Sequence, residues 1–257
     1  PATGAELWSG ARRLSIAGVQ IRRVSGVAAN DVGGLIVIDS GADQAYRVDP
    51  ALKLDKSWTL RNGEKPSWGP GGTFHVAARD SVIVPGVANR TFRVPGKEKG
   101  LDGIRAAERD PYGRWIVLGA RSNGILSYPA DGGFGRPVQR GDGDPADLAL
   151  DELDQLYVLE ERERRVLRIH LLDDERATLV RGDWKKAIAV TVDPFGFVHV
   201  RDGRNRVVGL DARSRRPEAQ VLEAGGEVIH RVAFGGLDVV IGVAEDVFLT
   251  HPHGPHR

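Results

Sequence analysis

Asp202-Gly-Arg-Asn-Arg-Val-Val, residues 202–208, is the stretch that decides the fold, because degenerate copies of it recur along the chain. One copy is Asp39-Ser-Gly-Ala-Asp-Gln-Ala-Tyr-Arg-Val, and another is Glu160-Glu-Arg-Glu-Arg-Arg-Val-Leu-Arg-Ile. Each copy follows one short apolar run and opens a second. Internal repetition with a period of about 20–50 residues indicates a solenoid, a propeller or another repeat array.

The spacing of the copies favours a propeller. Aligning the anchor position, which is Asp or Glu in four copies and Gly in two, gives six positions separated by 33 to 47 residues: Asp39, Gly86, Gly119, Glu160, Asp202 and Asp246. An interval of this length holds one four-stranded propeller blade. The composition agrees with an all-β protein, because the chain contains 33 glycines and short β-branched runs but almost no helical periodicity.

Each repeat has the internal order that a blade needs. Small, weakly alternating runs such as Asp147-Leu-Ala-Leu and Ala187-Ile-Ala-Val suit the crowded innermost strand. A turn of the form Asp-Pro-x-Gly follows at 110–113 and at 193–196, where proline presets one φ angle and glycine accepts a positive one. A continuous apolar second strand then ends at the anchor, whose side chain can bond nearby backbone N–H groups.

This pattern resembles the NHL-repeat family and the wider group of six-bladed, TolB-like β-propellers. The resemblance implies an all-β, six-bladed β-propeller of mostly four-stranded antiparallel blades. The N-terminal run from Leu14 to Ile21 has no blade of its own. We expect it to close the last blade as its outer strand, which removes an exposed sheet edge. We expect one propeller domain over residues 1–250, followed by a flexible His-rich tail at 251–257.

Composition excludes several classes of function. The formal net charge is +1, so no global field attracts nucleic acid. No apolar run reaches the roughly 18 residues that span a bilayer, so we expect no membrane insertion. The chain has no cysteine, which excludes disulfides and thiolate metal sites. It begins at Pro1 rather than Met, and together with the resemblance this suggests a processed bacterial protein located outside the cytoplasm, periplasmic or secreted.

Polar residues at the entries to the predicted inner strands are the candidate ligand-binding site. In propellers of this type ligands meet the axial pocket, and the side chains that we place there are Asp102, Asp147, Lys186, His230 and Arg231. These residues could hold a small anionic ligand. They could equally be solvated groups at the mouth of a channel that make local turn bonds. The sequence leaves both interpretations open.

The resemblance also raises the question of a metal. Six-bladed lactonases and related hydrolases hold a metal with Glu, Asn and Asp at axial positions, and a hard divalent cation wants several converging oxygen ligands. Here cations stand at Lys186 and Arg231, so we predict no metal and no cofactor. We assign no catalytic residue. His75, His170 and His199 form no evident metal triad and are interpreted as ordinary, partly buried histidines.

The predicted function is therefore a non-catalytic platform that binds another protein or an adjacent domain of the same polypeptide. The second blade has no run that suits an outer strand, so we expect an exposed edge there for a partner strand. The interaction residues expected there are Phe92, Arg93, Val94, Lys97 and Lys99. The alternative is small-molecule binding, or metal-dependent lactonase-like hydrolysis, at the axial pocket.

Overall fold

The structure is a computed structural model of the 257-residue chain. It describes residues 12–13, 16–29, 34–49, 51, 53–60, 63–68, 73–78, 81–84, 91–93, 103–120, 124–130, 133–139, 143–182, 184, 186–192, 197–203, 206–211, 219–223, 229–235, 238–243 and 246–250. All regular elements among these residues are β-strands. The described residues contain no helix long and apolar enough to cross a membrane. The all-β prediction is confirmed.

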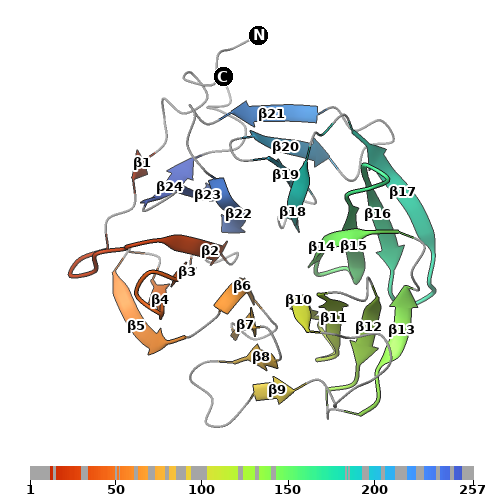
Figure 1. Cartoon of the computed structure of the whole chain (residues 1–257), viewed down its shortest axis with the longest axis horizontal. Helices are drawn as coiled ribbons and strands as arrows, with labels where there is room; N and C mark the ends of the chain where they lie inside the picture. Colours follow the sequence, from red (N-terminus) through yellow and green to blue (C-terminus); the bar gives the residue numbers. More distant parts are fainter. Residues whose placement is uncertain are drawn as a thin grey trace. The chain divides into compact units, whose positions relative to one another are not determined.

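The chain divides into two compact units. Residues 62–190 form one unit, and residues 1–61 together with 191–257 form the other. The first of these, called unit 2 below, contains three four-stranded antiparallel sheets in sequential order (Figure 1). Their strands are β6 (Gly63–Trp68), β7 (Phe74–Ala78), β8 (Ser81–Ile83), β9 (Thr91–Arg93), β10 (Ile104–Arg109), β11 (Trp115–Gly119), β12 (Ile125–Tyr128), β13 (Arg136–Gln139), β14 (Pro145–Leu150), β15 (Gln155–Glu160), β16 (Arg165–His170) and β17 (Arg176–Arg181).

The other unit, unit 1, contains two four-stranded sheets of its own. One has the order β2-β3-β4-β5, and the other has the order β1-β24-β23-β22. Their strands are β1 (Arg12–Arg13), β2 (Val24–Ala29), β3 (Leu35–Asp39), β4 (Gln44–Val48), β5 (Leu54–Thr59), β22 (Ile229–Gly235), β23 (Asp238–Val243) and β24 (Asp246–Thr250). A further four-stranded sheet has the order β18-β19-β20-β21. Its strands are β18 (Ala187–Val192), β19 (Phe197–Asp202), β20 (Arg206–Asp211) and β21 (Ala219–Glu223).

The predicted count of six blades is corrected by this arrangement. Five four-stranded sheets lie wholly within one unit or the other, whereas the boundary between the units falls inside β18 and leaves β19, β20 and β21 in unit 1. The chain is an all-β propeller with five blades, not six. Regular sequence spacing predicted the strands well, but spacing does not reveal where the packing between neighbouring blades divides.

The second predicted blade is also corrected. Its sheet has four strands, because β9 pairs with β8, with Val82 opposite Phe92. The strand assumed to be missing is therefore the one that contains Phe92 and Arg93. The sequence of β6, Gly63-Glu-Lys-Pro-Ser-Trp, is polar and contains proline, so it lacks the small apolar pattern that predicts the first strand of a blade. Because this sheet has four strands, no missing strand leaves an edge for a partner to fill.

An N-terminal strand pairs with the last strand of the chain, but it is not the predicted run. In β1, Arg12 lies opposite Leu249 and Arg13 lies opposite Phe248. The residues that follow lie elsewhere. Ile16 is buried in a core cluster with Val24 and Val27 of β2, and the partly buried Val19 and Ile21 pack against it. The segment after β1 therefore covers the sheet β2–β5 instead of extending an edge.

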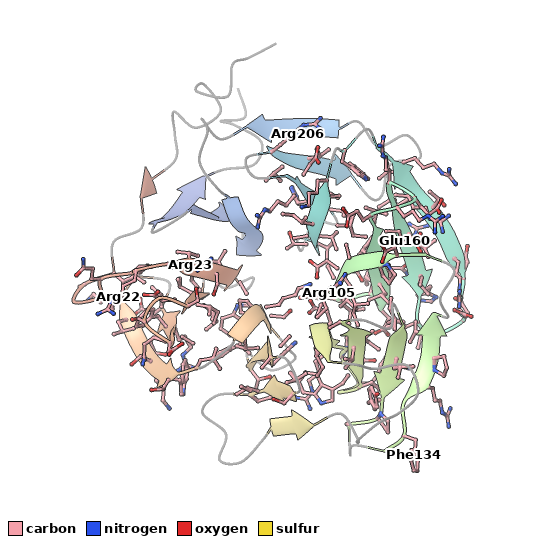
Figure 2. The ribbon with its side chains drawn as sticks, in the orientation of Figure 1. Arg22, Arg23, Arg105, Phe134, Glu160 and Arg206 are labelled. Atoms are coloured by element: carbon pink, nitrogen blue, oxygen red, sulfur yellow. The ribbon has the colours of Figure 1, made fainter. Side chains whose placement is uncertain are left out.

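The repeated acidic anchor has a structural role in three of its copies. Asp39, Glu160 and Asp202 are all buried at the end of the second strand of their sheets. Glu160 accepts a bond from Arg165, and Asp202 Oδ2 accepts a bond of 2.7 Å from Arg206 Nη1; Glu160 and Arg206 are labelled in Figure 2. Asp39 instead accepts backbone N–H groups, as predicted. The motif thus pins the second strand to the turn or strand beside it.

Candidate functional site

Three inner strands of unit 2 position the candidate site. β10 packs against both β6 and β14, and each of the three is the first strand of its sheet. Each also has a register irregularity near its start, at Gly63/Lys65, Ile104/Ala106 and Pro145/Asp147. Such bulges re-aim side chains. Lys65, Ala106 and Asp147 therefore occupy equivalent positions directly after the bulge on three neighbouring strands.

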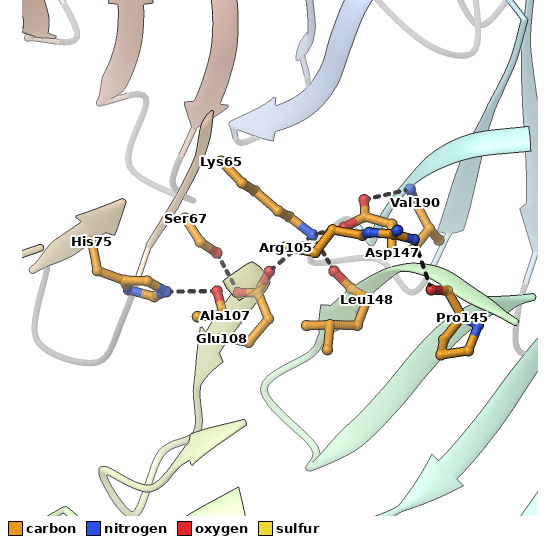
Figure 3. Close-up of polar contacts among 10 residues, drawn as sticks. All are labelled: Lys65, Ser67, His75, Arg105, Ala107, Glu108, Pro145, Asp147, Leu148 and Val190. Atoms are coloured by element: carbon orange, nitrogen blue, oxygen red, sulfur yellow. Dashed lines mark hydrogen bonds and ion pairs between the residues drawn. The ribbon is translucent and has the colours of Figure 1, made fainter. Parts of the chain in front are cut away.

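Lys65 is the centre of the site. Its ammonium nitrogen lies 2.6 Å from Asp147 Oδ1 and 3.5 Å from Glu108 Oε1, and it also donates to the carbonyl oxygen of Leu148 (Figure 3). The residue is only 5% exposed. The equivalent position on the strand between them is the small Ala106, so no long side chain stands there as Lys65 of β6 reaches Asp147 of β14.

Glu108 connects the lysine to a hydroxyl group. Ser67 Oγ donates a hydrogen bond to Glu108 Oε2, while Glu108 Oε1 faces the Lys65 ammonium. Glu108 is buried, but Ser67 is partly exposed. Lys65, Ser67, Glu108 and Asp147 are named the Lys65 cluster below. Within it, the partly exposed Ser67 hydroxyl lies between the buried Glu108 carboxylate and solvent.

Backbone groups hold the far side of the cluster. Asp147 Oδ2 accepts a 3.0 Å bond from the backbone N–H of Val190 in β18. Arg105, at the bulge of β10, donates from Nη1 to the carbonyl oxygen of Pro145 and from Nη2 to that of Ala120, both at 3.1 Å. Arg105 therefore ties the start of β14 to β10 and fixes the distance between the two strands that carry the carboxylates.

His75 lies behind the cluster on β7 and is fully neutral at ordinary pH. Its Nε2 lies 3.0 Å from the carbonyl oxygen of Ala107, so Nε2 carries the proton. Its ring meets Trp115 edge-on, at 4.9 Å between centroids. The pKa of His75 is lowered to about 4, mainly by burial and with a smaller contribution from the charges of Arg109 and Lys65, while the hydrogen bond to Ala107 opposes the shift. The ring is a buried packing and hydrogen-bonding group, which agrees with its interpretation as an ordinary histidine.

This lowered pKa predicts a loss of stability in acid. The unfolded state takes up a proton near the ordinary pKa of 6.5, and the folded state does so only near 4. The stabilising contribution is therefore complete above pH 6.5 and falls as the pH drops toward 4, by about 3 kcal/mol in total. Urea unfolding of the parent and His75→Gln between pH 7 and pH 4 checks it. The variant should lose less stability over this interval, and an equal loss in both proteins would contradict the assignment.

The structure places the predicted axial residues in different settings. Asp147 belongs to the Lys65 cluster. Lys186 is exposed and directly precedes β18. His230 and Arg231 lie on β22 of unit 1, and their side chains are not among those described. Asp102 lies outside the described residues. Of the five, only Asp147 is placed with other site residues in the described part of the chain.

The predicted interaction edge is placed only in part. Phe92 and Arg93 lie on β9, the last strand of its sheet, and nothing is described of their side chains. Val94, Lys97 and Lys99 lie outside the described residues. Their role in binding a partner stays a prediction.

Sequence reasoning missed Lys65, Ser67 and Glu108. The alignment of repeats contained a signal for Glu108. In the preceding repeat Ala106 aligns with Asp147, and Glu108 lies two positions after Ala106 on the same inner strand. Lys65 had the same alignment available, but the polar run that contains it was not recognised as an inner strand. Charged residues at inward positions of a crowded strand are costly to bury, so such residues indicate an oppositely charged partner nearby.

The cluster does not fit the divalent metal that the family resemblance suggests. The Lys65 ammonium already lies between the two carboxylates of Asp147 and Glu108, where a metal ion would have to be. A second positive charge there would be repelled at short range. Across the described residues, no group of three or more His, Cys, Asp or Glu side chains is arranged to hold a metal.

Comparison with known proteins supports the fold. No family model matches the chain, and no curated protein matches its sequence. A gluconolactonase from Xanthomonas campestris is 13% identical with a TM-score of 0.70, covering 91% of this chain and 87% of its own. A luciferin-regenerating enzyme is 14% identical, with a TM-score of 0.68 and coverage of 95% and 96%. The calcium-binding protein regucalcin from Agrobacterium tumefaciens is 13% identical, with a TM-score of 0.66 and coverage of 94% and 93%.

These identities are low, so the likeness concerns fold and not activity. The solved structures extend over nearly the whole of both chains in each comparison. No match supports the NHL repeat in particular. The chain has the β-propeller fold, shared with these structures.

Proposed function

We propose that the chain hydrolyses a small lactone or related ester at the Lys65 cluster, without a metal ion. The sequence raised lactonase-like hydrolysis as the alternative function, there with a metal ion, and the proposal here uses no metal. The observation that carries it is Glu108, whose carboxylate is bonded to the Ser67 hydroxyl on one side and faces the Lys65 ammonium on the other. A buried carboxylate held between a hydroxyl and a cation has the elements of general base catalysis.

Glu108 is the base in this proposal. It removes a proton from a water molecule that attacks the carbonyl carbon of the lactone, and a tetrahedral oxyanion forms. The ring C–O bond then breaks, and the proton passes from Glu108 to the departing alkoxide, which gives a hydroxy acid. Ser67 orients Glu108 and the water through its hydroxyl group.

Lys65 supplies electrostatic stabilisation. Its three N–H groups already face three oxygens, of Asp147, Glu108 and Leu148, so it acts by its charge and not as a free donor to substrate. A fixed positive charge in a site from which water is largely excluded stabilises developing negative charge more strongly than it would in water. Asp147 holds the ammonium in place from the opposite side.

The similar structures support the choice of substrate class. One is a gluconolactonase and another a luciferin-regenerating enzyme, so enzymes of small molecules are found on this fold. This support is an analogy at the level of the fold. The substrate itself is proposed from chemistry, because a single general base with a nearby cation suits an ester that is already strained or activated.

Substitution of the proposed base tests this function. We expect Glu108→Gln to lower kcat/KM for five- and six-membered aliphatic lactones by about 100-fold or more, because general base catalysis contributes at least that much. Proton release into a weak buffer with a pH indicator measures the rate. Glu175→Gln is the matched control, since Glu175 is an exposed carboxylate of the same unit. Equal rates for Glu108→Gln and the control would refute the assignment.

The non-catalytic platform stays a second hypothesis with one observation in its favour. Large apolar side chains are exposed at turns of two sheets in unit 2: Tyr112, Phe134, Leu153 and Leu172. Figure 2 shows Phe134 pointing away from the sheet β10–β13. In each sheet these residues lie in the turns from the first strand to the second and from the third to the fourth, which are at the same end of an antiparallel sheet. The proposed partner protein, and a location outside the cytoplasm, stay predictions as well.

A further inference from the structure

The oxygen atoms around the Lys65 ammonium form a shell of the kind that usually surrounds a metal ion. The three atoms are Asp147 Oδ1, Glu108 Oε1 and the carbonyl oxygen of Leu148, and the described contacts of Nζ involve no nitrogen or sulfur. Hard divalent cations such as Ca²⁺ prefer carboxylate and carbonyl oxygens. The cation that is actually present in this shell belongs to the protein.

Both carboxylates are held by groups other than the lysine. Asp147 Oδ2 is fixed by the backbone N–H of Val190, and Glu108 Oε2 is fixed by Ser67. The oxygens that face Nζ therefore do not depend on the ammonium for their position. Removing the lysine side chain would leave two negative charges and one carbonyl oxygen directed at the same small space.

We propose that Lys65 is a built-in cation that occupies a latent divalent-cation site, so that the parent protein binds no divalent ion there and loss of the side chain exposes the site. This inference rests on the same cluster as the proposed hydrolysis. It goes further, because it states which chemical group replaces the metal and which ligand the remaining residues would take. Two buried carboxylates and a carbonyl oxygen directed at one small space attract a divalent ion, whereas the ammonium present in the parent repels it.

Thermal unfolding of Lys65→Ala with and without calcium tests the proposal. We expect 10 mM CaCl₂ to raise the Tm of this variant by about 5 °C or more relative to EDTA, since a ligand well above its Kd stabilises the folded state and a chain of this size responds by a few degrees per kcal/mol. The parent should shift by less than about 1 °C. The matched control is Lys65→Ala/Asp147→Asn, which lacks one of the carboxylates and should respond like the parent.

Two results would overturn the inference. One is an unchanged Tm for folded Lys65→Ala in calcium, which would make the cluster an ordinary buried ion pair. The other is an equal shift in the parent and the variant, which would place the bound calcium elsewhere.

Refolding covers the case in which Lys65→Ala does not fold in EDTA. Dilution from urea into 10 mM CaCl₂ should then restore folding, and NaCl of matched ionic strength should not. Failure of calcium to restore it overturns the proposal equally. These measurements need no substrate, so a protein that lacks lactone hydrolysis can still confirm the cation site, and the failure of one idea is distinguishable from the failure of the other.

Discussion

Replacing Lys65 with methionine is expected to lower the free energy of unfolding by about 3–5 kcal/mol, the usual cost of removing one partner from a buried ion pair. The methionine fills a similar volume but removes the ammonium that pairs with Glu108 and Asp147, and both residues are at most 5% exposed. Equilibrium unfolding in urea, followed by tryptophan fluorescence, measures the change.

Two variants show whether charge is the cause. Lys53→Met removes an exposed lysine whose described hydrogen bonds, both with Asp49, use its backbone N–H and carbonyl groups, and its effect should stay within about 0.5 kcal/mol. Adding Glu108→Gln and Asp147→Asn to Lys65→Met removes the two buried negative charges and should recover much of the lost stability. A cost below about 1 kcal/mol for Lys65→Met alone would show that the cluster is more hydrated than its burial indicates.

Replacing Asp39 with alanine is the second large effect, at about 4 kcal/mol. Its fully buried carboxylate accepts backbone N–H bonds from Arg22 at 2.8 Å, Arg23 at 2.9 Å, Gly41 at 3.0 Å and Ala42 at 3.2 Å. Alanine leaves all four donors without this partner. The anchor joins the segment before β2 to the turn between β3 and β4, so that segment should also lose protection from hydrogen exchange.

A surface aspartate provides the comparison for Asp39. Asp49 accepts one backbone bond, from Lys53 N at 2.9 Å, in an exposed turn. We expect Asp49→Ala to cost about 1 kcal/mol or less. Similar costs for the two substitutions would mean that the buried anchor contributes no more than an ordinary turn residue. Thermal and urea unfolding of both variants measure the difference.

The sequence predicted the strands best where the repeat is regular. Around Asp202 and Glu160 the apolar second strand, the acidic anchor and the third strand lie in the structure where the pattern indicated. The prediction failed at β6, because two charges and Pro66 replace the small apolar residues of other inner strands. The blade count failed for a different reason, since it depends on packing between repeats and not on their spacing.

The site was predictable only at Asp147. That residue opens a recognisable inner strand, and the alignment of repeats was enough to find it. Lys65 and Glu108 were not found, because their importance comes from each other. The two are 43 positions apart, and only the packing of β6 against β10 brings Nζ to 3.5 Å from Oε1. Sequence patterns describe one strand at a time, while buried charge pairing is decided between strands.

The most direct test is the rate of lactone hydrolysis by protein that has been treated with a chelator. Purified protein is dialysed against EDTA, and initial rates are measured with a six-membered lactone for the parent, Glu108→Gln and Glu175→Gln. We expect the parent and Glu175→Gln to keep their full rates after chelation and Glu108→Gln to lose about 100-fold or more. A parent rate no higher than the uncatalysed background, or one that disappears with EDTA and returns with a divalent metal, would contradict it.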